Sequence, residues 1–66
     1  MSRSAADALI RRLQLREEIE GLELSLRVFR AHDQAGAAAT VATSLARARA
    51  EKEVLDSKLR QLAGLN

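Results

Sequence analysis

The segment Glu23–Phe29 reads ELSLRVF, and its apolar residues nearly alternate with polar ones. Taken alone, such alternation is typical of a half-buried β-strand. The flanking sequence argues against a strand, because apolar residues recur on both sides at alternating spacings of three and four, the period of a helix packed along one face. The sequence therefore predicts that this segment belongs to a long helix with apolar side chains on opposite faces.

Two sets of positions at this helical spacing cover most of the chain, and we call them the seam. They are Ala5, Ala8, Arg12, Leu15, Ile19, Leu22, Leu26 and Phe29, followed by Ala38, Val41, Leu45, Ala48, Lys52, Leu55, Leu59 and Leu62. If the chain folds back at residues 33–34, the two sets face each other in pairs whose residue numbers sum to 67, and large residues often meet small ones. We predict an all-α, coiled-coil-like antiparallel two-helix hairpin, completed to a helical bundle by self-association or by a partner.

Residues with strong positional preferences mark the expected ends of the two helices. The S-A-A-D run that starts at Ser4 reads as a capping box, and Asp33 is expected to cap the second helix. Gly64 suits the left-handed position after a helix, with Leu65 folding back onto it. The expected organisation is one domain over residues 1–66, with a helix at about 4–31, a bend at about 32–36 and a helix at about 34–63.

Composition limits what can stabilise a chain of 66 residues. Cysteine is absent and His32 is the single histidine, so disulfides and a His/Cys zinc site are excluded. A chain this short has a marginal core of its own, which leaves association as the remaining support. It has no apolar run of the length of a membrane span and no signal-peptide core near Met1, so we expect a cytoplasmic protein that does not bind membranes.

The charges are interleaved, and the formal net charge is only +2. Arg12 and Lys52 interrupt the seam; their stems are expected to lie on apolar surface with their heads in water, or else to set the register. Most other charges are spaced to pair along a helix at i,i+4, as on a solvated surface. The expected pairs are Asp7–Arg11, Arg16–Glu20, Glu23–Arg27, Arg47–Glu51, Arg49–Glu53 and Lys52–Asp56.

Large apolar residues also lie on the side of the first helix that points away from the seam. At 100° per residue, Leu24 and Val28 point almost directly away from the seam, and so do Ile10 and Leu13, with Leu9 on the flank. A lone hairpin covers only one face of this helix, and an exposed apolar patch of this size marks an interface. We therefore predict that a homo-oligomer or a helical protein partner binds at Leu9, Ile10, Leu13, Leu24 and Val28.

No catalytic, cofactor-binding or metal-binding residues are predicted. His32 beside Asp33 could act as an oriented base, but it sits at a bend, where solvation is the simpler reading. A Rop-like dimeric four-helix-bundle RNA-binding regulator remains the alternative function, with possible arginine clusters at residues 11–16 and 47–49. A single aromatic residue disfavours nucleic acid. A designed or structural bundle without a natural ligand also remains open.

The length, the near-central bend and the Ala/Leu-rich second helix, SLARARAEKEVLDSKLRQL, resemble the small helical-hairpin co-chaperones of type III secretion needle subunits. The chain lacks an aromatic residue early in its second helix, which is a departure from that family. The resemblance implies a cytosolic, non-enzymatic protein that pairs with a larger helical-repeat chaperone and keeps the needle subunit from polymerising. No site residues transfer from the family, because no specific motif is matched.

Overall fold

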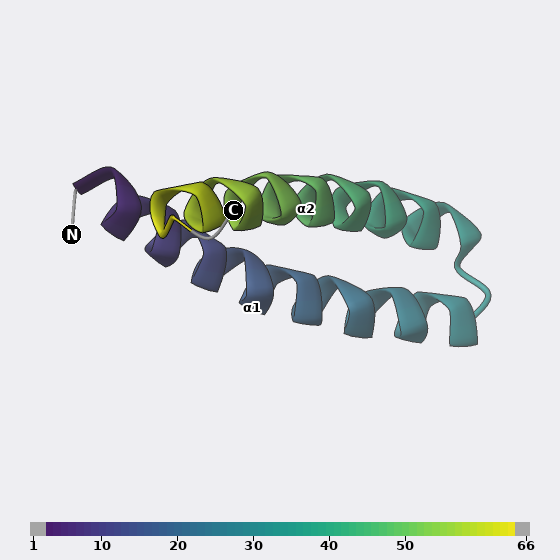
Figure 1. The fold of residues 1–66 in the computed structure, drawn as a ribbon. Coiled ribbons are helices and arrows are strands. Elements are labelled where there is room, and N and C mark those ends of the chain that lie inside the picture. Colours follow the sequence, from purple (N-terminus) through teal and green to yellow (C-terminus); the bar gives the residue numbers. More distant parts are fainter. Residues whose placement is uncertain (1–2, 65–66) are drawn as a thin grey trace.

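The computed structural model describes residues 3–64, with side chains from residue 5 onwards. It is an all-α helical hairpin of two antiparallel helices, α1 (Arg3–Ala31) and α2 (Ala35–Leu62). The helices lie side by side, and the start of α1 and the end of α2 lie at the open end of the hairpin (Figure 1). The predicted all-α antiparallel two-helix hairpin is confirmed.

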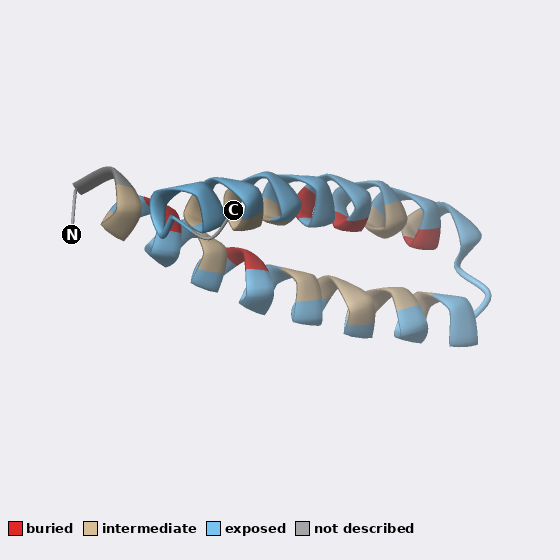
Figure 2. Ribbon diagram, in the orientation of Figure 1, coloured by how far each residue is buried: buried red, intermediate tan, exposed pale blue. Residues whose placement is uncertain are grey.

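The molecule is long and only one helix thick. Its principal extents are 46 × 18 × 13 Å, and a helix with its side chains is about 10–12 Å across. Each helix therefore contacts protein on one side only. Buried and half-buried residues face the other helix, while the outward surfaces are exposed (Figure 2).

The core is small and follows the predicted seam. The buried apolar residues are Ala8, Leu15, Ala38, Leu45 and Ala48. Most other seam positions are half-buried, because two helices alone cannot enclose a side chain completely. Leu62 is an exception: it was expected opposite Ala5, but it is 50% exposed at the open end of the hairpin.

The turn between the helices differs from the prediction at Asp33. Asp33 adopts a left-handed backbone with φ of 56°, and its N–H donates to the carbonyl of Arg30. The next N–H, from Gln34, donates to the carbonyl of Phe29 at 2.9 Å. These two bonds form a Schellman motif that ends α1. The expectation that Asp33 caps α2 was wrong, since Gln34 occupies that position without a side-chain capping bond.

The start of α1 differs from the predicted cap, whereas the end of α2 agrees with it. Helix α1 already begins at Arg3, so Ser4 lies inside the helix rather than at its cap position. At the end of α2, Gly64 has φ of 72° and donates its N–H to the carbonyl of Gln61, as the left-handed position after a helix requires. The expected contact of Leu65 lies outside the described residues.

Candidate interaction surface

The charged residues at the seam connect the two helices. Arg12 and Lys52, which interrupt the apolar positions, both bind the carboxylate of Asp56, Arg12 from the opposite helix and Lys52 at 3.0 Å from one turn earlier in α2. These hydrogen bonds, with that from Lys52 the larger influence, lower the pKa of Asp56. The charged groups of Arg12 and Lys52 therefore converge on the carboxylate of Asp56 and do not point separately into water.

Two further ion pairs join the helices on the exposed flanks. Arg11 makes a bidentate contact with Glu51 at 2.6 and 3.0 Å, and Arg49 binds Glu23 at 2.8 Å. The hydrogen bond from Arg11 lowers the pKa of Glu51. Of the six i,i+4 pairs expected from the sequence, only Lys52–Asp56 forms within the described residues. Cross-helix pairing therefore replaces pairing along each helix, and it favours the antiparallel register.

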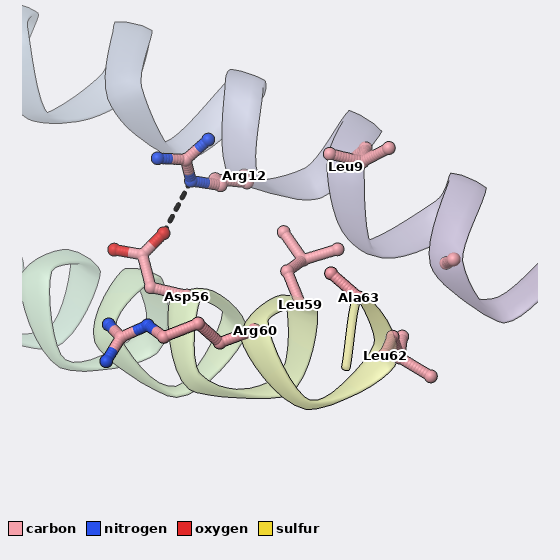
Figure 3. A pocket seen from close by; sticks show the side chains of 8 residues that line it. Leu9, Arg12, Asp56, Leu59, Arg60, Leu62 and Ala63 are labelled. Atoms are coloured by element: carbon pink, nitrogen blue, oxygen red, sulfur yellow. Dashed lines mark hydrogen bonds and ion pairs between the residues drawn. The ribbon is translucent and has the colours of Figure 1, made fainter. Parts of the chain in front are cut away.

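A pocket of about 570 Å³ lies between the helices at the open end of the hairpin (Figure 3). Its lining residues are Ala5, Leu9, Arg12, Asp56, Leu59, Arg60, Leu62 and Ala63. Arg12 and Asp56 satisfy each other within it, and leucines supply much of the remaining wall. Such a lining suits an apolar side chain better than a reacting substrate, because it presents no nucleophile with an adjacent base.

All five residues that the sequence assigned to partner binding are exposed. Leu9 is 41% exposed, Val28 49%, and Ile10, Leu13 and Leu24 56–59%. They do not form one continuous patch. Leu9 lines the pocket at the open end (Figure 3). At 1.5 Å per residue, Leu13 lies about 16 Å along α1 from Leu24, and Ile10 lies about 27 Å from Val28.

Two exposed apolar residues on α2 were not predicted as binding residues. Val54 is 67% exposed, the highest value among the large apolar residues described, and Leu62 lies at the pocket. Val54 belongs to a row of mostly small residues on the side of α2 that points away from the seam, where a single valine carries little signal. That row consists of Ala39, Thr43, Ala46, Ala50, Val54 and Ser57. The isolation of Val54 makes it a suitable control position for the surface on α1.

No group of three or more His, Asp or Glu side chains among the described residues is arranged to hold a metal ion. Neither described helix is long and apolar enough to cross a bilayer. No family model, curated protein or solved structure matches this chain.

Proposed function

We propose that this chain is a non-enzymatic protein–protein interaction module, a small helical-hairpin adaptor or chaperone subunit. Its binding surface is the outer face of α1, which we define as Ile10, Leu13, Leu24 and Val28, with Leu9 at its edge. One observation supports the proposal above all: these large apolar side chains remain about half exposed or more, although α1 already buries its opposite side against α2. Covering them with a helix would remove apolar surface from water.

The charge arrangement favours a protein partner over RNA. Arg11, Arg12 and Arg49 belonged to the two candidate phosphate-binding clusters, and each is bound to a carboxylate of the opposite helix. Binding phosphate there would require these ion pairs to be exchanged. Rop-like RNA binding remains the second candidate, on the strength of the hairpin architecture alone.

The resemblance to type III secretion needle co-chaperones suggests a specific form of the proposal. In that form the chain acts in the cytoplasm, where a helical-repeat chaperone or the needle subunit would cover the outer face of α1. The same surface would serve any amphipathic helix with apolar residues at i, i+3 and i+4.

The experiment compares Leu24→Glu with the control Val54→Glu, which places the same charge at an exposed apolar position on α2. Each tagged variant and the tagged natural chain are expressed in the host of the protein, and the proteins that remain bound after purification are identified by mass spectrometry. Self-association of each purified chain is measured by sedimentation. We expect Leu24→Glu to abolish every association that Val54→Glu retains, with the circular dichroism of both unchanged. Associations that survive in Leu24→Glu, or that both variants lose equally, would refute the outer face as the binding surface.

A further inference from the structure

The exposed area of the hairpin exceeds what a compact chain of its mass presents. The accessible surface is 4985 Å², whereas a compact monomer of 7.2 kDa exposes about 4100 Å². The excess of about 900 Å² is close to the roughly 800 Å² that each partner buries in a standard protein interface. Covering an interface of standard size would therefore bring the exposed area of the hairpin close to that of a compact chain of its mass.

The outer side of α1 has an order of residue types that reads the same in both directions. The positions along it, three or four residues apart, are Ala6, Ile10, Leu13, Glu17, Glu20, Leu24, Val28 and Ala31. Outward from the centre, each half therefore presents glutamate, leucine, a β-branched residue and alanine in the same order. In an interface with two-fold symmetry, residue i contacts residue j while j contacts i. With this order of residues, an antiparallel α1–α1 pairing brings leucine to leucine and β-branched residue to β-branched residue.

We propose that the partner covering this face is a second copy of the chain, with α1 packed antiparallel against α1 about a two-fold axis between Glu17 and Glu20. This inference rests on the proposed binding surface and names its occupant. Leu13 then faces the partner's Leu24, and Ile10 lies within one residue of the level of the partner's Val28, so the two apolar clusters of one chain cover those of the other. The separation of the clusters along one helix is explained by the same symmetry.

The centre of this interface is acidic. Glu17 of one chain faces the partner's Glu20, and the same pair recurs across the axis, so that four carboxylates meet there. Like charges in this position weaken association. This arrangement predicts opposite effects of one and two substitutions. A lysine at position 17 or 20 alone faces a glutamate of the second copy, whereas lysines at both positions face each other.

The test is sedimentation equilibrium on the whole chain, comparing Glu17→Lys, Glu20→Lys and the double variant. We expect a dimer whose Kd falls about tenfold with either single change and returns to the starting value or higher with both. Glu53→Lys on α2 makes the same change in charge and should leave the Kd unaltered. A chain that stays monomeric at all concentrations, or single variants that fail to bind more tightly, would overturn the proposal.

Cysteine cross-linking tests the orientation independently, because the chain has no cysteine of its own. Under mild oxidation, a mixture of Leu13→Cys and Leu24→Cys should cross-link between chains. Leu13→Cys alone should not, because the two copies of residue 13 would lie about 16 Å apart along the helices. Cross-linking of Leu13→Cys to itself would overturn the antiparallel arrangement. If the chain is monomeric but Leu24→Glu still loses a bound host protein, the second copy is wrong and the proposed function stands.

Discussion

Leu13 and Leu15 form a matched pair for testing the packing of α1. They lie two residues apart in one helix, so changing either to alanine alters helix propensity equally. Leu15 is 1% exposed and Leu13 is 56% exposed. The difference between the two substitutions therefore reports how much packing against α2 contributes to the free energy of unfolding, because the change in helix propensity is the same in both.

The expected costs follow from the buried area. Leu15→Ala removes three buried carbon groups at about 0.8 kcal/mol each, or about 2.4 kcal/mol in all. We expect a loss of about 2–3 kcal/mol in the free energy of unfolding, at the lower end of buried Leu→Ala substitutions. Leu13→Ala removes the same groups from a position already more than half exposed, so its cost in the monomer should be about 1 kcal/mol or less.

The assay is urea unfolding followed by circular dichroism, at chain concentrations low enough that further dilution leaves the curve unchanged. Any contribution from self-association is then absent, and the difference reports the hairpin alone. Equal losses in the free energy of unfolding for the two variants would show that Leu15 does not lie on the side of α1 that faces α2. A larger loss for Leu13→Ala would reverse the assignment of the two faces.

Three further predictions concern stability. Asp33→Gly should raise the free energy of unfolding by about 1 kcal/mol in the same assay, because glycine adopts the left-handed backbone without the penalty of a Cβ. Gly21→Ala should add about 1 kcal/mol to the free energy of unfolding, since a Cβ at this position meets no atom within 4 Å apart from its chain neighbours and the local helix backbone. The lowered pKa of Asp56 means that this group stabilises the fold above its unfolded pKa near 4, and that the contribution is lost as the pH falls through the lower folded value. Thermal unfolding between pH 5 and 2 should therefore depend less steeply on pH in Asp56→Asn.

The seam is the part of the fold that could be read from sequence. Every seam residue from Ala5 to Leu59 is buried or half-buried, because the helical repeat of large apolar and small residues leaves one favourable way to pair two helices. The exposed residues on the outer face of α1 were also identified from their angular position alone. Both are consequences of the period of 3.6 residues, which is a local property of the chain.

The turn and the ion pairs could not be read in the same way. Aspartate is a preferred N-cap residue, yet Asp33 ends α1 instead. The chain must turn there to bring α2 back against α1, and the turn places Asp33 in a left-handed backbone conformation. The charges had several partners within reach along each helix. Side chains choose among them only when the second helix is in place, since Arg11 and Glu51 are 40 residues apart in sequence.

The amino-acid sequence by itself determined the two helices, their antiparallel pairing and the presence of a second apolar face, because helical periodicity is encoded residue by residue. Only the tertiary structure decided which charges meet, how α1 ends, and that Leu9 and Leu62 line a pocket at the open end. These features depend on the distance and alignment between segments far apart in the chain. The spacing of residues along one helix does not specify where the side chains of the other helix lie.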